Sequence, residues 1–212
     1  SANITSTVAL CPGYLGGAIA QKNDLAGQGK RLWLLVPAGI IGGTCGGILL
    51  LCLSADIFRI LVPFLILLAS VLLAVQDRVR SWVEKHTGTG GSKKRGLPGT
   101  FLPVSLAAVY GGYFGAGLSV IVLAVLGLFI DDTLTRLSAL KQCISLSING
   151  AAAVFFLFSG LVVWPLVLIM AAGALAGGAM GGSVAGRINP VLLRWTVVVI
   201  GLVVGFILLA QM

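Results

Sequence analysis

The sequence predicts an all-α polytopic membrane protein made of two related repeats of membrane helices, and its composition is the first reason. Of its 212 residues, 58% are hydrophobic and only 9% are charged, and the mean hydropathy is +1.09. A soluble domain carries about a quarter charged residues, so this composition cannot supply a water-exposed surface. Because a spanning helix needs roughly 20 apolar residues, we expect about six full spans and one broken or re-entrant segment. Five long stretches contain no charged residue: 1–21, 32–53, 96–130, 142–186 and 195–212.

The charged residues divide the chain into two hydrophobic halves. The net charge is +8, and most basic residues lie in two loops, 21–31 and 77–95. Lys and Arg gather in cytoplasmic loops because positive charge resists translocation, so we expect both loops to be cytoplasmic. The predicted organisation is a first membrane repeat at 1–76, a basic cytoplasmic linker at 77–98 and a second membrane repeat at 99–212. The lipid bilayer, and not nucleic acid, is the expected partner of this charge.

A second reason is an internal repeat. The stretch "GGTCGGILLLCLSADIFR", which ends at Arg59, matches "GGAMGGSVAGRINPVLLR", which ends at Arg194, in four glycines and the arginine at one constant offset. With one small gap, Ser1–Val75 aligns with Ser138–Gln211. Two-fold repeats of membrane helices are typical of many transporter folds. In the second half, the uncharged segment 96–130 comes before the aligned unit that starts at Ser138, so we expect an equivalent segment before Ser1.

The orientation of the two halves depends on how segment 96–130 meets the membrane. If it crosses once, the halves are parallel, and Arg136, Lys141, Arg187 and Arg194 face the outside. If it is a hairpin that enters and returns at its glycines, the halves are inverted and those four charges become cytoplasmic. The positive-inside rule favours the inverted arrangement, and the single crossing stays open as the alternative.

The third reason is the glycine-rich stretch "VYGGYFGAG", residues 109–117. A phosphate-binding loop would follow a strand in an aqueous βαβ unit, and the composition excludes such a unit. Inside a bilayer, non-helical backbone is tolerated only where it is buried in protein or lines a polar cavity. We interpret the stretch as a broken helix whose free N–H groups attract an anion, with close packing of small residues as the alternative. Two other stripes, with glycine at every fourth position, are predicted to be helix-packing surfaces: Gly39, Gly43 and Gly47, and Gly173, Gly177 and Gly181.

Polar residues from both repeats are expected to converge on this break. Lys141 and Asn149 share roughly one face of a predicted span, and Thr5 and Ser6 lie opposite them by repeat symmetry. Hydroxyl and amide groups can replace part of the hydration shell of an oxyanion. For Lys141 the alternative is snorkelling to the lipid headgroups, and each other side chain could instead satisfy a neighbouring helix. The predicted substrate-binding set is Thr5, Ser6, Tyr110, Gly112, Tyr113, Gly115, Lys141 and Asn149.

Asp131 and Asp132 follow the broken segment. Intramembrane carboxylates mark proton relays, so both are candidates for proton coupling, with capping of the following helix as the alternative. No catalytic or metal-binding pattern accompanies them, because the chain has one histidine and six acidic residues, and its four cysteines have no C-x-x-C spacing. The sequence therefore indicates neither an enzyme nor a metal or cofactor.

Four stretches together resemble a known family: "TSTVALCPGYLGGAIAQ", "VYGGYFGAGLSVIVLAVLGL", "SALKQCISLSINGAAAVFFLFSGLVVW" and "GGAMGGSVAGRI". They are similar to the TauE/SafE sulfite exporter family, also called the toluene-sulfonate uptake permeases, over essentially the whole chain. The resemblance implies a secondary transporter, an exporter or permease, of small anions such as sulfite, sulfonates and related sulfur oxyanions. It also implies the cytoplasmic (inner) membrane of a bacterium. From the family we further expect a glycine-rich first membrane segment before Ser1, and an asparagine where Ser138 stands.

Two alternatives to an active transporter remain at this stage. Glycine-striped faces alone would serve a membrane scaffold that transports nothing, and a carrier that had lost its first segment would be inactive. The same stripes would suit a homodimer as well as helix packing within one chain.

Overall fold

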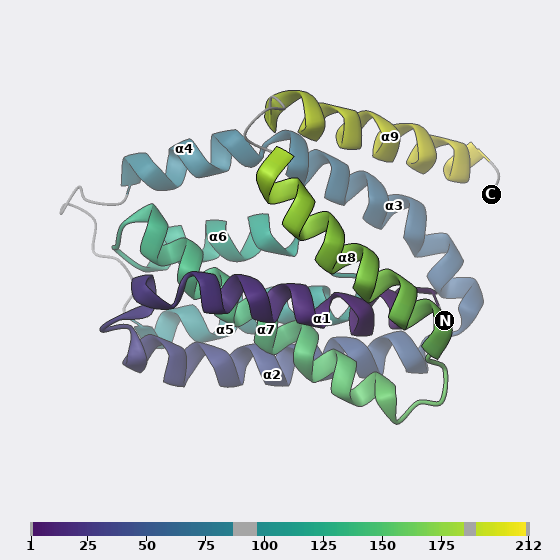
Figure 1. The fold of residues 1–212 in the computed structure, drawn as a ribbon, viewed down its shortest axis with the longest axis horizontal. Helices are drawn as coiled ribbons and strands as arrows, with labels where there is room; N and C mark the ends of the chain where they lie inside the picture. The colour runs from purple at the N-terminus through teal and green to yellow at the C-terminus, as the bar shows by residue number, and fades with distance from the viewer. Residues whose placement is uncertain (1, 87–96, 185–189, 211–212) are drawn as a thin grey trace.

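The structure, a computed structural model, describes residues 2–86, 97–184 and 190–210, and every regular element in these ranges is helical (Figure 1). The prediction of an all-α protein is confirmed. The basic residues at 93–95 and Arg187 lie outside the described residues. The elements are α1 (Ala2–Ala20), a short 3-10 helix η1 (Lys22–Leu25), α2 (Gly29–Cys52), α3 (Ala55–Ala74), α4 (Gln76–His86), α5 (Leu97–Tyr113), α6 (Leu118–Phe129), α7 (Leu134–Leu157), α8 (Trp164–Val184) and α9 (Pro190–Ala210).

Hydroxyl side chains fix where two of the long helices begin. The Ser54 hydroxyl at the start of α3 accepts a hydrogen bond from the Ile57 amide at 3.4 Å. The Thr133 hydroxyl at the start of α7 accepts one from the Arg136 amide, also at 3.4 Å. The first amides of a helix have no partner within it, and a capping hydroxyl supplies one.

The predicted polar linker is partly helical, since α4 occupies its first half. Val79 and Trp82 on α4 pack against a core that includes Leu123 and Phe129 of α6. Residues three apart lie on the same face of a helix, so this mostly polar segment still has an apolar stripe to bury. Its overall polarity concealed that stripe in the sequence.

Glycines bring α2 into close contact with α5 and α7. A Cβ at Gly43 would collide with the Ile148 carbonyl on α7, and a Cβ at Gly112 on α5 would collide with the Gly43 carbonyl. Gly39 and Gly47 also face side chains of α7. Such close approach of backbones is how small residues hold membrane helices together, so the packing prediction is confirmed for the stripe on α2.

The corresponding glycine stripe on α8 differs from that on α2 at Gly173, the one glycine of this stripe whose surroundings the structure describes. No described atom lies within 4 Å of a Cβ placed at Gly173, so within the described part of the chain this glycine makes no close contact with another helix, contrary to the prediction. Leu168 and Ile169 on the same helix are 69% and 68% exposed. The surroundings of Gly177 and Gly181 lie outside what the structure describes.

Segment 96–130 forms a hairpin. Figure 1 shows α5 running alongside α2 and α6 returning beside α5 after a turn at residues 114–117, and the contacts between these helices agree. Phe101, in the second turn of α5, and Phe129, at the end of α6, pack against the same core. The alternative of a single crossing is therefore wrong.

Corresponding helices of the two repeats run in opposite directions. Ile4, in the first turn of α1, packs with Phe156, in the last turn of α7, so these two helices are antiparallel. The pair formed by α3 and α9 is also antiparallel (Figure 1). The halves are therefore inverted, as the positive-inside rule favoured.

The bundle has two chemically different ends. One end, hereafter the basic end, holds the α1–α2 connection with Lys22 and Lys30, and the α6–α7 connection with Arg136. The Arg136 guanidinium donates to the Ala26 carbonyl at 3.0 Å and so joins these two connections. The opposite end holds the α2–α3 and α7–α8 connections and the first turn of α1.

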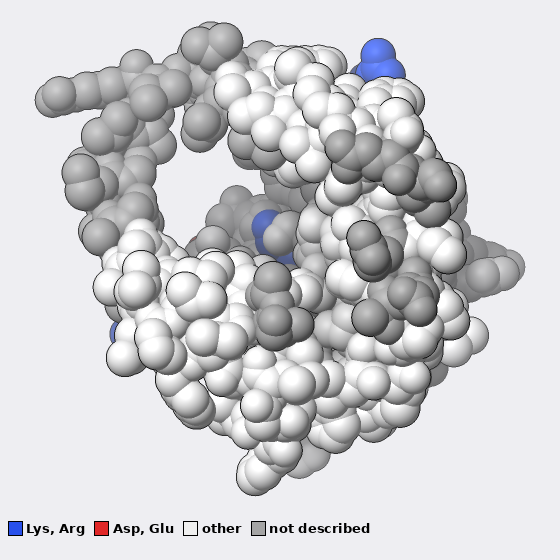
Figure 2. Space-filling model, turned by 90° about the vertical axis from the view of Figure 1, so that its right-hand side faces the viewer, with Lys and Arg blue, Asp and Glu red and all other residues white. Residues whose placement is uncertain are grey.

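The exterior of the bundle is apolar. Leu102 and Leu106 on α5 are 66% and 63% exposed. Figure 2 shows the end of the bundle opposite the basic end, where the described residues in view are almost all uncharged. By length and composition α2 and α7 could each cross a membrane, and α3, α6, α8 and α9 contain shorter apolar stretches. Hydrocarbon suits such a surface, because the helices satisfy their own backbone groups. The number of full spans stays a prediction.

Candidate functional site

A cavity of about 420 Å³ lies where the α5–α6 turn meets α1, α7 and the α3–α4 junction. The described residues that line it include no acidic and no basic residue. Amide and hydroxyl groups are supplied by Asn3, Ser6, Thr7 and Tyr14 of α1, Gln76 of α4, Ser119 of α6 and Asn149 of α7. We call this space the large cavity.

The polar face of α1 follows from helical spacing. Asn3, Thr7, Leu10 and Tyr14 are separated by three or four residues, which places them on one stripe. The Thr7 and Ser6 hydroxyls each donate to the Asn3 carbonyl at 2.9 Å. Both hydroxyls can rotate to exchange this internal bond for a ligand. The stripe therefore offers hydrogen-bonding groups to the large cavity without leaving them unsatisfied when it is empty.

The Asn3 and Asn149 side chains are held in place by the backbone. The Asn3 amide donates to the Tyr113 carbonyl at 2.9 Å, which satisfies a carbonyl at the end of α5. The Asn149 amide, only 6% exposed, donates to the Ser145 carbonyl one turn earlier at 2.9 Å. These bonds connect α1 to the broken segment and fix the orientation of the amide that faces the cavity from α7.

Two glycines and a tyrosine hydroxyl determine the conformation of the turn between α5 and α6. Gly115 and Gly117 have φ of 80° and 75°, a region that other residues rarely adopt. The Tyr110 hydroxyl donates to the Ala116 carbonyl at 2.6 Å and closes the turn. α6 then begins at Leu118 with no side-chain cap, and Leu118, Ser119 and Val120 line the large cavity. The positive end of the α6 dipole thus opens on that cavity.

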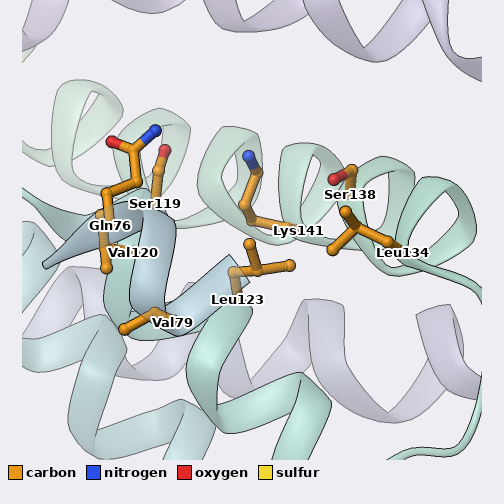
Figure 3. Close-up of a pocket in the computed structure, with 8 residues that line it drawn as sticks. All are labelled: Gln76, Val79, Ser119, Val120, Leu123, Leu134, Ser138 and Lys141. Carbon is orange, nitrogen blue, oxygen red and sulfur yellow. The ribbon is translucent and has the colours of Figure 1, made fainter. Parts of the chain in front are cut away.

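A second, smaller space of about 170 Å³ lies closer to the basic end. Figure 3 shows Gln76, Ser119, Lys141 and Ser138 with their polar ends on one side of this small cavity, above a floor of leucine and valine side chains. Ser138 and Lys141 come from the first two turns of α7. Lys141 is the charged residue of its lining.

The sequence-predicted residues divide between these cavities and other places. Ser6, Gly115 and Asn149 line the large cavity, and Lys141 lines the small one. Two repeats therefore do contribute polar groups beside the glycine break. Their role in substrate binding stays a prediction.

The other four predicted residues lie outside both linings. The Thr5 hydroxyl accepts a hydrogen bond from the Val163 amide at 3.4 Å and holds the α7–α8 connection. Tyr110 closes the α5–α6 turn, and Gly112 serves the contact with α2. The Tyr113 ring is 6% exposed and its hydroxyl has no hydrogen-bond partner among the described residues. Binding roles for these four are untested.

Sequence reasoning missed several lining residues. Asn3, Thr7 and Tyr14 lie on the same stripe as Ser6, so the helical period of polar residues in α1 could have found them. Gln76 and Ser119 had no such signal. Gln76 and Ser119 line the same cavity only because the fold brings the α3–α4 junction next to the start of α6.

Asp132, in the connection after α6, is part of an ionic network at the basic end. Asp132 forms an ion pair with Arg31 of α2 and lies 3.0 Å from the Arg136 guanidinium. Burial alone would raise the pKa of Asp132, but the hydrogen bonds from Arg31, the Thr133 amide and Arg136 outweigh it and lower the pKa. The network therefore favours the ionised form of Asp132. A role of Asp131 and Asp132 in proton coupling stays untested.

A helical bundle with an apolar exterior, two inverted repeats and a polar cavity at a broken helix defines a polytopic membrane protein of the transporter class. The chain matches the family described as "Sulfite exporter TauE/SafE" over residues 1–208, and it belongs to that family of membrane transporters. The resemblance seen in the sequence is thereby confirmed.

A named relative has the same general character. The chain is 23% identical over 185 residues to a "Probable membrane transporter protein" of Haemophilus influenzae, and the match covers 86% of this chain and 68% of that protein. No solved structure matches the chain.

Proposed function

We propose that this membrane transporter is a secondary carrier of small oxyanions, with sulfite, sulfonates or related sulfur oxyanions as substrates, in the cytoplasmic membrane of a bacterium. The observation that carries the proposal is the large cavity, which joins amide and hydroxyl groups to the N-terminal end of α6 and has no carboxylate among the described residues that line it. The family and the relative support transport in general, and the chemistry of the cavity supports the anion.

The lining suits an anion better than a cation. Sites for divalent cations usually include carboxylates, and none is among the described residues of this lining, whereas Asn3, Gln76, Ser119 and Asn149 can all donate hydrogen bonds. In low dielectric a helix N-terminus attracts negative charge without needing a buried arginine. An oxyanion with several acceptor oxygens can be held by such neutral donors in place of water. Neutral donors also allow the anion to dissociate, because they bind it less tightly than a positively charged side chain would.

Lys141 and the inverted repeats supply the remaining parts of a carrier. Lys141 lies on the small cavity toward the basic end, where its charge would raise the local concentration of anions. Inverted repeats permit a site at their junction to face either side of the membrane in turn, by rocking of one part against the other. The large cavity lies where α1 and α7, corresponding helices of the two repeats, meet the hairpin.

The test is a thermal-shift series on detergent-purified protein with sulfite, sulfate, thiosulfate, methanesulfonate and chloride at matched ionic strength. A bound anion at about 100 times its Kd adds about 2.7 kcal/mol to stability, so one sulfur oxyanion should raise Tm by several degrees. Uptake of the same anion into proteoliposomes tests transport. A flat response to every anion on folded protein would overturn the proposal and favour a membrane scaffold.

A matched pair of variants locates the effect. Asn149→Asp places a negative charge in the large cavity with little change of shape and should abolish both the thermal shift and uptake. Asn23→Asp makes the same chemical change on the exposed 3-10 helix, outside both linings, and should keep both. An undiminished shift in Asn149→Asp would place the anion elsewhere.

A further inference from the structure

The two cavities share one wall. Gln76, Ser119 and Val120 line the large cavity and also the small one. Gln76 is the first residue of α4 and Ser119 is the second residue of α6, so the wall forms where two helices begin beside each other. In Figure 3 the Gln76 amide and the Ser119 hydroxyl lie at the same end of the small cavity.

The cavities extend from this wall toward opposite ends of the bundle. The large cavity reaches Asn3 and Ser6 in the first two turns of α1, which begins at the end opposite the basic one. The small cavity reaches Leu134 and Ser138 in the first turns of α7, which begins at the basic end. A solute that entered one cavity and left by the other would have to pass the shared wall.

From this geometry we infer that Gln76 and Ser119 form the constriction through which the transported anion passes between the large cavity and the basic end. This inference rests on the proposed function. Both side chains are neutral and can donate as well as accept hydrogen bonds, so they can replace part of the anion's hydration shell without trapping it. Val120, the third residue of the shared wall, is apolar and offers the anion no hydrogen bond. Gln76 and Ser119 are therefore the residues that select which anions pass.

Accessibility of single cysteines tests the constriction directly. The four native cysteines, Cys11, Cys45, Cys52 and Cys143, are free thiols and are replaced by alanine in the background chain. Three serines are then changed one at a time, Ser6→Cys on the large cavity only, Ser138→Cys on the small cavity only and Ser119→Cys on both. The probe is the membrane-impermeant cation 2-(trimethylammonio)ethyl methanethiosulfonate, which is not an oxyanion and so lies outside the proposed substrate class; it is applied to oriented vesicles from either side.

Ser138→Cys should react only from the side of the basic end, and Ser6→Cys only from the other side. Ser119→Cys should react from both, and the bound anion should slow that reaction at least threefold. Labelling of Ser119→Cys from one side alone, while the two other cysteines react as expected, would overturn the inference. If Ser119→Cys reacts from both sides but no anion shifts Tm or enters proteoliposomes, the shared passage stands and the proposed substrate class fails.

A bulky side chain provides a second test in the otherwise native chain. Ser119→Phe should reduce anion uptake at least tenfold, because the ring would fill the wall shared by the two cavities. Ser81→Phe adds the same ring to an exposed position of α4 outside both linings and serves as the control. Undiminished uptake in folded Ser119→Phe would exclude this wall as the passage.

Discussion

Asp132, in the connection after α6, forms an ion pair with Arg31 in the first turn of α2. The same carboxylate also binds Arg136 on α7. Gln28, only 1% exposed, extends the network, since its amide donates to the Arg136 carbonyl at 3.1 Å and its oxygen accepts from Arg31 at 3.1 Å. The network thereby connects the end of α6 to the first turns of α2 and α7.

Asp132→Asn should destabilise the protein by about 1–3 kcal/mol, because it removes hydrogen bonds to charged partners and leaves two guanidinium groups without their shared anion. The measurement is Tm in detergent, followed by intrinsic fluorescence. Asp24→Asn is the matched control, since Asp24 lies at the same end and its carboxylate has no ion pair in the described part of the chain. Equal Tm losses in both variants would show that the network contributes nothing specific.

The same aspartate predicts a dependence of stability on pH. Its pKa is lowered in the folded protein from the ordinary value of 3.8, so the ionised form favours folding. That contribution is complete above the unfolded pKa and is lost as pH falls through the lower, folded pKa. Between about pH 5 and 3 the wild type should therefore lose more stability than Asp132→Asn. Parallel curves for wild type and Asp132→Asn would contradict this account.

Gly43→Ala should be strongly destabilising, although alanine is the better helix former. The added Cβ would collide with the Ile148 carbonyl and lie 2.9 Å from its Cα, and overpacking of this kind costs about 1–3 kcal/mol or more. Helix propensity returns only about 1 kcal/mol, so the collision decides the sign. Gly173→Ala, where no described atom lies within 4 Å, should be neutral or slightly stabilising. Tm and the monodisperse fraction on size exclusion report both, and a stable Gly43→Ala would disprove the close packing.

The fold was predictable because its main signals are local or periodic. Apolar runs of spanning length, the repeated glycines and the distribution of lysine and arginine led to the helices and the inverted halves. The α4 helix was not foreseen, because the apolar stripe of Val79 and Trp82 is stable only against α6. The secondary structure of such a segment depends on its tertiary contacts and not on its local composition.

The site was predictable only in part, for reasons visible in neighbouring residues. Thr5 and Ser6 are chemically alike and adjacent, but one helical step turns Thr5 to the α7–α8 connection and Ser6 to the large cavity. Gly112 and Gly115 are also alike in sequence. Gly112 is required by its close contact with α2, and Gly115 by its positive φ. A side chain is unfavourable at both positions. The sequence alone does not separate these causes.

Lys141→Gln tests whether the lysine attracts substrate through space. If it does, anion uptake into proteoliposomes should fall about three- to tenfold at about 0.01 M salt and differ little from wild type at about 1 M, because the screening length shrinks from about 30 Å to 3 Å. Lys22→Gln makes the same charge change at the basic end outside both linings and should have little effect. A loss of uptake that is equal at every salt concentration would instead make Lys141 a direct ligand. Unchanged uptake at low salt would favour simple snorkelling.

Two tyrosines on one turn of α5 should respond in opposite ways to loss of the hydroxyl. Tyr110→Phe removes the 2.6 Å hydrogen bond to the Ala116 carbonyl and should cost about 0.5–1.5 kcal/mol, seen as a lower Tm. The Tyr113 hydroxyl is buried without a described partner, so Tyr113→Phe should leave Tm unchanged or raise it, since an unsatisfied buried hydroxyl is a penalty.

The anion-dependent part of Tm then distinguishes structure from binding at Tyr113. If this hydroxyl binds substrate, as the sequence predicts, Tyr113→Phe should keep or gain stability without anion and lose part of the shift that sulfite produces. If the hydroxyl is only a buried group without a partner, the shift should match that of the wild type. A Tm that falls without any anion would contradict both accounts, because it would mean that the hydroxyl is already hydrogen-bonded in the folded protein.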